Sequence, residues 1–488
     1  MSLYSKIHLK LLTIGIFSIV LFSACEGDFL DTVPKTSIDQ EKAFSTPGKI
    51  LAQVNSLYGQ LQNQNFYGGR FIVFNEQRGD EFGQNDGNAA TGSAVWNQNV
   101  ASTNEYINNV WSAGYTAINA SNILIEQLKK TKVISDSLAK LYIAEAKYVR
   151  ALCYLSLVQT YAKPFNLDRT ALGLPLRLTA ITGVGYNDLV RSTVEEVYNQ
   201  ILLDLNEAEE DLPIAYTTPL LNISRAHKST AIALKTRVYL NQANYQKVVE
   251  EASKLVPLNS PYQYTSGSIT HNLESAIANV FTGTYTGPEA IFFIPFANSN
   301  TETPSAQYAL AFNYLTQPII FLATAGIVGN PALTGKEDAR SAFITSNAAK
   351  QKVLKKFSIT TAPFRDYVPV LRYAEVMLNF AEAAANLNDL GTAANLLNAV
   401  RHRSNPTYVF PSDAIATKDS LINTILTERR IEFLGEGLRL QDLQRRTQSL
   451  PAKTGSIGTA PEVLTSAKNY IWPIPSGELS TNKLCLPN

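Results

Sequence analysis

The stretch that decides the fold is residues 370–404, which read VLRYAEVMLNFAEAAANLNDLGTAANLLNAVRHRS. Its first half carries apolar residues three or four positions apart, the spacing that lines up one face of an α-helix: Tyr373, Val376, Met377, Phe380 and Ala384. A polar turn at 388–391 interrupts this pattern, and Leu396, Leu397 and Val400 resume it. The stretch therefore predicts two helices joined by a tight turn.

The same helix–turn–helix pattern occurs a second time. Apolar positions with matching spacing follow a polar turn in both places: Tyr245, Val248, Val249, Ala252 and Leu255 in one, and Leu390, Ala393, Ala394, Leu397 and Val400 in the other. Leu141 to Ala162 fits part of a third copy. Helix pairs of roughly 34 residues are typical of tetratricopeptide-like repeats, which bury their apolar faces by stacking. We predict a mainly α fold: a tetratricopeptide-like helix-pair scaffold with long loop-rich insertions and minor β-structure.

The bulk composition describes a globular protein with no dominant charge. The 488 residues include 45% apolar and 17% charged residues, and the formal net charge is +1. No overall field therefore favours nucleic acid or an acidic surface. Three cysteines do not indicate a disulfide framework.

The amino terminus has the features of an export signal. Lys6 and Lys10 precede an uninterrupted apolar run, 11–22, which is too short to span a bilayer comfortably. The run leads into Leu21-Phe22-Ser23-Ala24-Cys25, which resembles the bacterial lipobox. We expect Cys25 to be lipidated, so that the acyl chains hold the body on a membrane. The alternative is an ordinary signal peptide followed by an incidental cysteine.

Two loop-rich blocks interrupt the helical pattern. The predicted organisation is a signal peptide at 1–24, a lipidated tether at 25–45, an N-terminal helical region at 46–260 with a loop insertion at 63–109, a loop-rich region at 261–365, and a C-terminal helical region at 366–488. Loops this long in a compact protein are usually functional or disordered. Their many aromatic residues argue against disorder.

Candidate ligand-binding residues lie in these two blocks. Sugars present apolar C–H faces and many hydroxyl groups, so their sites combine an aromatic platform with fixed polar groups. The first block offers Trp96 as the platform, with Arg78, Asp80 and Asn99 as hydrogen-bonding partners, and the second offers Tyr285, Tyr308 and Tyr314. The alternative for each aromatic residue is simple packing in the core.

A charged segment near the carboxyl end has two interpretations. It contains Glu428, Arg429, Arg430, Glu432, Glu436, Arg439 and Asp442. Paired carboxylates can cleave glycosides, but carboxylates so mixed with arginines more often form a structural ion network. We predict such a network, and we predict no catalytic residue. The histidines show no metal-ligand spacing, so we also predict no metal and no cofactor. The alternative is a calcium ion on Asp80, Glu81 and Asp86, whose spacing fits no known calcium loop.

Several motifs together resemble the SusD/RagB family of Bacteroidetes outer-membrane lipoproteins. The matching features are the lipobox at Cys25, Asp28-Phe29-Leu30-Asp31, Leu371-Arg372-Tyr373-Ala374-Glu375, Asn379-Phe380-Ala381-Glu382-Ala383, Leu397-Asn398-Ala399-Val400-Arg401, Glu428-Arg429-Arg430-Ile431-Glu432-Phe433, Glu436-Gly437 with Arg439, Asp442-Leu443, and Trp472-Pro473-Ile474-Pro475. The family often has aromatic residues between the positions of Arg439 and Asp442, where this chain has Leu440-Gln441. That departure concerns packing.

The resemblance implies a helical scaffold, lipid-anchored to the outer membrane and facing the cell exterior, that docks on a SusC-like TonB-dependent β-barrel. It implies an oligosaccharide as the ligand, and it favours Trp96 because the corresponding region of the family contributes a tryptophan. RagB-type relatives take peptides, which is the first alternative. A lipid-anchored glycoside hydrolase and a purely structural adaptor are the others.

Overall fold

The computed structural model describes residues 40–488 except residues 184, 186 and 336. The predicted signal peptide, Cys25 and most of the predicted tether fall on residues 1–39 and lie outside the described residues. The chain divides into two compact units, Met1–Leu51 and Ala52–Asn488. The described end of the first unit holds α2 (Gln40–Ala43) and the start of α3 (Pro47–Leu61). The account below concerns the second unit.

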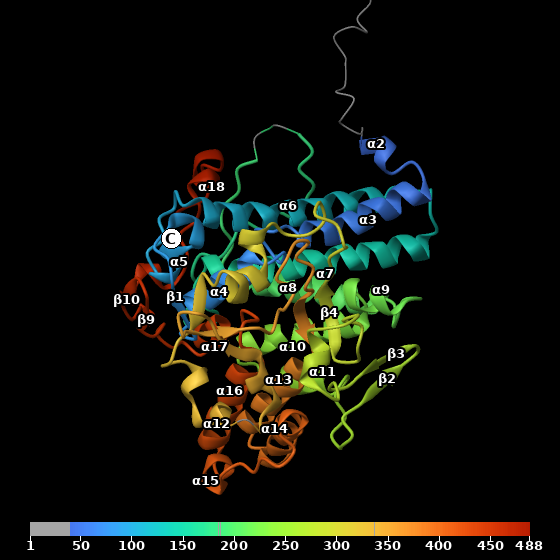
Figure 1. Cartoon of the computed structure of the whole chain (residues 1–488). Helices are drawn as coiled ribbons and strands as arrows, with labels where there is room; N and C mark the ends of the chain where they lie inside the picture. Colours follow the sequence, from blue (N-terminus) through green and yellow to red (C-terminus); the bar gives the residue numbers. More distant parts are fainter. Residues whose placement is uncertain (1–39, 184, 186, 336) are drawn as a thin grey trace, which may run out of the picture. The chain divides into compact units, whose positions relative to one another are not determined.

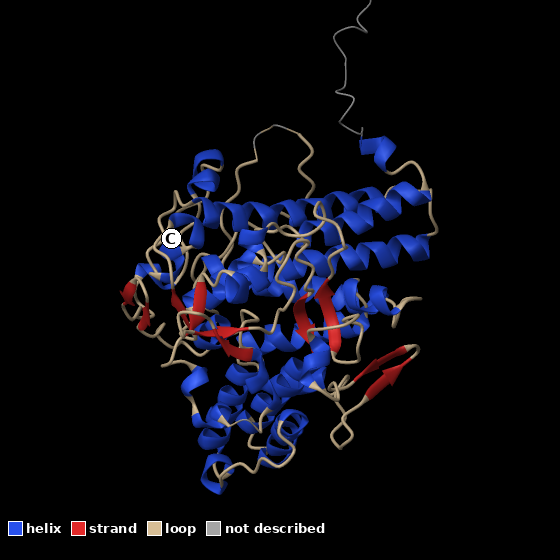
Figure 2. Cartoon of the chain, in the orientation of Figure 1, coloured by secondary structure: helices blue, strands red, loops and turns tan. Residues whose placement is uncertain are grey.

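Helices dominate the second unit, as Figure 2 shows, and the predicted mainly α fold is confirmed. The helices of its first half are α4 (Arg70–Arg78), α5 (Ser93–Trp96), α6 (Glu105–Leu128), α7 (Asp136–Tyr161), α8 (Val194–Asp211), α9 (Pro219–Ser224), α10 (Lys228–Asn241) and α11 (Tyr245–Ala252). Those of its second half are α12 (Pro331–Thr334), α13 (Tyr373–Asn386), α14 (Leu390–Ser404), α15 (Ser412–Ile415), α16 (Lys418–Glu432), α17 (Arg439–Arg445) and α18 (Ser476–Thr481).

The long helices stack on one another in a continuous series, which Figure 1 lets the reader follow. Helix α6 packs on α7, α7 on α8, and α8 on α10. The series continues through α11, α13 and α14. Each helix pair buries its apolar face against the next pair, as a tetratricopeptide-like scaffold requires.

The two sequence repeats have the same turn chemistry. Ala243 precedes α11 with φ 52° and Asn388 precedes α14 with φ 67°, both left-handed conformations. In each case the next residue caps the helix with a side-chain oxygen. Asn244 accepts from the backbone N–H of Lys247 at 3.3 Å, and Asp389 accepts from Thr392 at 3.1 Å. The cap satisfies a backbone donor that the first helical turn leaves open.

Helix α4 corrects the expectation that residues 63–109 are non-helical. All nine of its residues are buried, including Arg70, Glu76 and Arg78. A helix that is surrounded on all sides has no solvent face, so it does not produce an amphipathic pattern. Periodicity therefore could not reveal it.

Ten short strands form five antiparallel pairs: β1 (Phe82–Gln84) with β5 (Ile320–Leu322), β2 (Tyr264–Ser266) with β3 (Ile269–His271), β4 (Ala290–Ile294) with β8 (Val368–Arg372), β6 (Ile344–Ser346) with β7 (Lys352–Leu354), and β9 (Lys453–Gly455) with β10 (Gly458–Ala460). Strand β4 lies within the loop-rich region predicted at 261–365. The β1–β5 pair joins the two loop-rich blocks, because each block supplies one of its strands. Within the described residues, no helix combines the length and apolar content needed to cross a membrane.

Candidate functional site

Trp96, predicted as the platform for a sugar ring, lies in the interior. Its side chain is 0% exposed, and its indole Nε1 donates to the backbone oxygen of Phe82 at 2.9 Å. The ammonium group of Lys453 lies 5.4 Å from the ring centroid. A ring covered in this way has no face open to a ligand, so the expectation that Trp96 forms an open platform is wrong.

Arg78 and Asp80 are occupied by other parts of the protein. Arg78 is buried, donates to the backbone oxygen of Tyr470 at 2.8 Å, and lies 5.6 Å from the Trp472 ring centroid. Both carboxylate oxygens of Asp80 accept from Arg439, at 2.6 and 2.9 Å. The expectation that these two side chains point to a ligand is corrected. They hold the carboxyl-terminal segments against the end of α4.

Two of the three candidate tyrosines also pack inside the protein. Tyr314 is 0% exposed, and its hydroxyl donates to the backbone oxygen of Gly435 at 3.1 Å. Tyr285 stacks on Tyr367 with ring centroids 4.4 Å apart, and its hydroxyl donates to Asp366 at 3.3 Å. The packing interpretation therefore holds for both, and neither offers a free ring face to a ligand.

Tyr308 and Asn99 keep an accessible surface. Tyr308 is half-buried, with the guanidinium carbon of Arg70 5.4 Å from its ring centroid. Asn99 is exposed. The structure does not bring the seven predicted ligand residues together around one site, so ligand contact by Tyr308 and Asn99 stays a prediction.

The loop blocks instead build a surface cluster of amide and hydroxyl groups, which we call the amide cluster: Asn85, Asn347, Gln351 and Ser456. The Gln351 Nε2 donates to Asn85 Oδ1 at 2.6 Å and to Ser456 Oγ at 3.1 Å. The Ser456 hydroxyl donates to Asn85 Oδ1 at 2.8 Å, and Asn347 donates to Gln351 Oε1 at 2.9 Å. Three distant segments are thereby fixed next to one another.

A half-buried phenylalanine lies in the strand pair beside this cluster. Phe321 of β5 pairs with Gly83 of β1, two residues before Asn85. A Cβ atom at Gly83 would lie 2.5 Å from the Phe321 ring, so the ring requires a glycine across from it. We call Phe321 and the amide cluster the loop face. It combines a partly open apolar ring with oriented polar groups, as small-molecule sites do.

Sequence reasoning missed Phe321, Gln351 and Ser456. The apolar run 319–322 indicates a short buried strand and gives no sign that one ring stays partly open. Gln351 lies in the β6–β7 hairpin and Ser456 in the β9–β10 hairpin, and only the packing of these hairpins against β1 and β5 brings both to Asn85. No local pattern could have found them.

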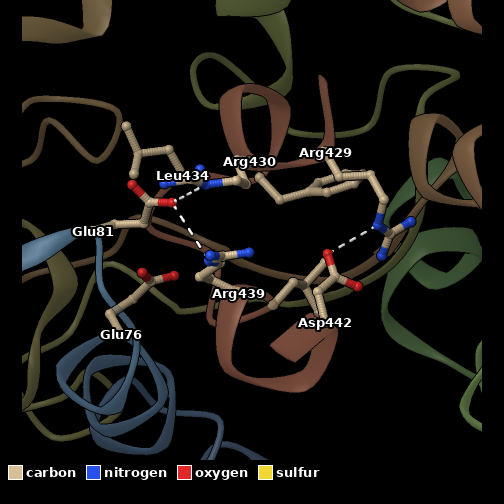
Figure 3. A pocket seen from close by; sticks show the side chains of 9 residues that line it. Glu76, Glu81, Arg429, Arg430, Leu434, Arg439 and Asp442 are labelled. Carbon is tan, nitrogen blue, oxygen red and sulfur yellow. Dashed lines mark hydrogen bonds and ion pairs between the residues drawn. The ribbon is translucent and has the colours of Figure 1, made fainter. Parts of the chain in front are cut away.

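A group of buried ion pairs lies around α16 and α17, and Figure 3 shows part of it. The Arg430 Nε donates to Glu81 at 2.6 Å, and the Arg429 Nε donates to Asp442 at 2.9 Å. Arg439 reaches both Asp80 and Glu81. These side chains surround a cavity of about 10 Å³, which is about the space of one water molecule.

The predicted glutamates pair with arginines that the sequence analysis did not assign. Glu432 binds Arg340 at 2.8 Å and Arg372 at 2.6 Å. Glu436 binds Arg372 at 2.9 Å and Lys356 at 2.8 Å. Three further ion pairs complete the group: Arg403 on Glu432, and Arg340 and Arg401 on Glu428. Together with the pairs in Figure 3, these contacts place all seven predicted ion-network residues in ion pairs.

The electrostatics of the group keep Glu432 and Glu436 ionised. Burial acts to raise the pKa of Glu432, but the guanidinium groups of Arg403, Arg372 and Arg340 outweigh it and hold that pKa well below its usual range. Burial is likewise outweighed at Glu436, whose pKa is lowered by Arg372 and Lys356. A glycosidase needs one carboxyl group with a raised pKa as the general acid. These two residues have the opposite environment.

The described residues also lack a metal centre. No group of three or more His, Cys, Asp or Glu side chains in the described part of the chain is placed to hold a metal ion. The charged groups near α16 are paired with each other. Their arrangement is that of an internal framework that locks α16, α17 and strand β8 together.

Two family models match this chain. Residues 28–240 match the family described as "Starch-binding associating with outer membrane", and residues 352–487 match the family described as "SusD family". Among curated proteins, the SusD-like protein P2 of Formosa agariphila is 24% identical, over 97% of this chain and 98% of that protein.

Solved structures give the same assignment. A SusD superfamily protein from Bacteroides fragilis is 31% identical with a TM-score of 0.81, covering 91% of this chain and 99% of that one. A laminarin-binding SusD-like protein shares the fold at 20% identity and a TM-score of 0.70, with 91% and 99% covered. Because the B. fragilis protein is matched over its whole length at this identity, the chain belongs to the SusD superfamily.

Proposed function

We propose that this chain is a non-catalytic, lipid-anchored glycan-binding protein of the outer membrane that faces the cell exterior. In this proposal it captures an oligosaccharide and delivers it to a SusC-like TonB-dependent β-barrel. The observation that carries the proposal is the match of residues 28–240 to the family described as starch-binding and associating with the outer membrane. The laminarin-binding protein of the same fold supports a polysaccharide as the ligand.

The loop face is the part of the chain that we propose binds the glycan. The exposed part of the Phe321 ring meets the apolar C–H face of a sugar, and the amide cluster meets its hydroxyl groups. Because the amide cluster is already hydrogen-bonded internally, its groups are oriented before the ligand arrives. Preorganisation of this kind lowers the entropic cost of binding.

The non-catalytic part of the proposal is supported by the carboxylates of the ion network. The side chains of Glu428 and Glu432 are 0% exposed and that of Glu436 is 4% exposed. Each already binds at least two cationic side chains. A glycoside could reach none of them without disrupting these pairs.

Replacing Phe321 with alanine is expected to weaken oligosaccharide binding by up to about tenfold, because an aromatic stacking contact is worth about 0.5–1.5 kcal/mol. Calorimetry with laminarin, a malto-oligosaccharide and a peptide panel measures the affinity. The peptides test the RagB-type alternative. Phe165→Ala is the matched control: Phe165 is also half-buried, but it packs on Tyr198, far from the amide cluster in sequence. An equal loss of affinity in both variants would contradict the loop face as the binding site.

Cys25→Ala is expected to move the protein from the membrane fraction to the soluble fraction, because it removes the residue that we propose carries the acyl chains. Cell fractionation and immunoblotting measure this change. The same membranes, solubilised in mild detergent, should yield a barrel of transporter size that co-purifies with the wild-type chain. Retention of the Cys25→Ala chain in the membrane would count against the anchor.

A further inference from the structure

A second hollow lies away from the loop face. It has a volume of about 250 Å³ and is bounded by α9, the β2–β3 hairpin and the loop that precedes β4. In Figure 1, α9, β2 and β3 lie at the right of the view, whereas β1, β9 and β10 of the loop-face side lie at the left. The two regions are therefore separate.

The hairpin forms one wall of the pocket through a tight turn. Gly267 adopts φ 59°, a left-handed conformation that the turn between β2 and β3 requires. Ser268 follows it and is exposed at the pocket. Apolar groups of Pro219, Ile223 and Ile269 supply part of the lining.

His271 lies behind the lining of the pocket, with its ring almost wholly covered. Its ring is 1% exposed, and its Nδ1 lies 3.4 Å from the backbone oxygen of Pro288. A carbonyl oxygen only accepts, so Nδ1 carries the proton and Nε2 is left as an acceptor. Among the described residues, Nε2 has no hydrogen-bond partner. Burial lowers the pKa of His271 to about 4, so the ring is neutral near pH 7.

Asn222 supplies a donor in the same lining. Its Oδ1 accepts from the backbone N–H of Tyr216 at 2.6 Å, which fixes the orientation of the amide. No described residue accepts from its Nδ2 group. The hydroxyl groups of Ser268, Thr270 and Thr286 complete the polar lining.

The lining identifies the class of ligand. Within the described part of the chain, no Asp, Glu, Lys or Arg side chain lines this pocket. An anionic ligand would therefore lose its hydration without gaining an opposite charge. Neutral hydroxyl groups, in contrast, match the amide of Asn222 and the serine and threonine hydroxyl groups, and C–H faces match the isoleucine and proline side chains. The volume is slightly below the roughly 300–1,000 Å³ of sites for drug-sized ligands, which favours a single ring.

We propose that this pocket binds one ring of a neutral sugar, at a site separate from the loop face. The site adds a second point of attachment for a glycan. It also gives the protein a way to bind a monosaccharide or the end of a chain that the loop face does not hold. The pocket shares no residue with the loop face, so this second site does not depend on glycan capture there.

Two pairs of threonines provide a matched test. The hydroxyls of Thr270 and Thr265 lie 3.2 Å apart, and those of Thr286 and Thr284 lie 2.9 Å apart. In each pair the first residue lines the pocket and the second is exposed outside the lining. The double variant Thr270→Leu, Thr286→Leu removes two lining hydroxyls and fills the space. The control Thr265→Leu, Thr284→Leu breaks the same two contacts and adds the same volume outside the pocket.

The probe is D-glucose, with gluconate as its charged counterpart, and saturation-transfer NMR with the full chain measures the affinity. We expect saturable glucose binding, at least about tenfold weaker gluconate binding, and a loss of about tenfold or more for glucose in the lining variant but not in the control. Thermal unfolding of both variants checks the fold. Equal losses in both, equal affinity for gluconate, or no saturable glucose binding would overturn the proposal.

Phe321→Ala separates this proposal from the proposed function. It should leave glucose binding unchanged while it weakens oligosaccharide binding. If it abolishes the glucose signal, glucose binds at the loop face, and the pocket proposal fails while the proposed function stands. If the lining variant alone loses glucose and no oligosaccharide binds the wild type, the pocket proposal stands and the proposed function fails.

Discussion

Replacing Arg372 with alanine is expected to lower the free energy of unfolding by about 3–5 kcal/mol, the usual cost of removing one partner from a buried ion pair. Its side chain is 2% exposed and binds Glu289 at 2.7 Å, Glu432 at 2.6 Å and Glu436 at 2.9 Å. Without the guanidinium group, three buried carboxylates share fewer cations. Urea unfolding followed by circular dichroism measures the change. A variant that does not fold at all would also agree with the expectation, because it would have lost still more stability.

Two further variants test whether the loss of unfolding free energy grows with the burial of the ion pair that is broken. Lys247 pairs with Glu250 at the surface, where both side chains are about half exposed, so Lys247→Ala should lower the stability far less than Arg372→Ala. Arg430 is 21% exposed and binds Glu81 at 2.6 Å, so Arg430→Ala should fall between the two. If Arg372→Ala costs no more than Lys247→Ala, the buried ion pairs do not stabilise this fold.

Glu76 of α4 is expected to make a contribution to the unfolding free energy that falls by a few kcal/mol between about pH 5 and pH 8, because each unit of pKa shift is worth about 1.4 kcal/mol. Burial raises its pKa from 4.5 to about 8, although the N–H of Gly437 donates to Oε1 at 2.6 Å and acts in the opposite direction. The folded chain therefore keeps a proton that the unfolded chain releases near pH 4.5. The contribution is fully present below pH 4.5 and is lost as the pH rises to about 8.

Glu76→Gln tests this assignment. Glutamine keeps the shape and the Oε1 acceptor but does not titrate, so the unfolding free energy of the variant should rise relative to that of the wild type as the pH increases through that window. The variant should be more stable than the wild type at pH 8. Glu250→Gln, at an exposed carboxyl whose pKa Lys247 lowers, should follow the wild-type profile. Parallel profiles for wild type and Glu76→Gln would show that Glu76 does not cause the pH dependence.

The helix-pair scaffold could be predicted because its helices keep a solvent face. In α14, Ala393, Leu396, Leu397 and Val400 are buried while most other positions are not, which produces the period of 3.6 residues. Helix α4 has no such face and was missed. The start of α7 was also missed by several residues, because it depends on a local cap: Ser135 accepts from the backbone N–H of Leu138.

The candidate site was harder to predict than the fold, because composition alone does not show whether a ring is covered. Trp96 lies in a segment rich in asparagine and glycine, which suggested an open loop. In the structure, however, the ammonium group of Lys453 lies over the Trp96 ring, and the indole N–H of Trp96 donates to the backbone oxygen of Phe82. Asp80 has the sequence context of a loop carboxylate, and only the structure shows Arg439 beside it. Both outcomes depend on contacts with residues more than 300 positions away, which spacing cannot encode.

The contact between Asn85 and Ser456 spans 371 positions. Ribosomes synthesise a polypeptide from its amino terminus onward, so α6 can pack on α7 in the nascent chain long before Ser456 is added. The surface that we propose recognises the glycan is then among the last parts to assemble. Contacts of such wide sequence separation form slowly, and premature termination anywhere upstream of residue 456 would leave a helical body without it.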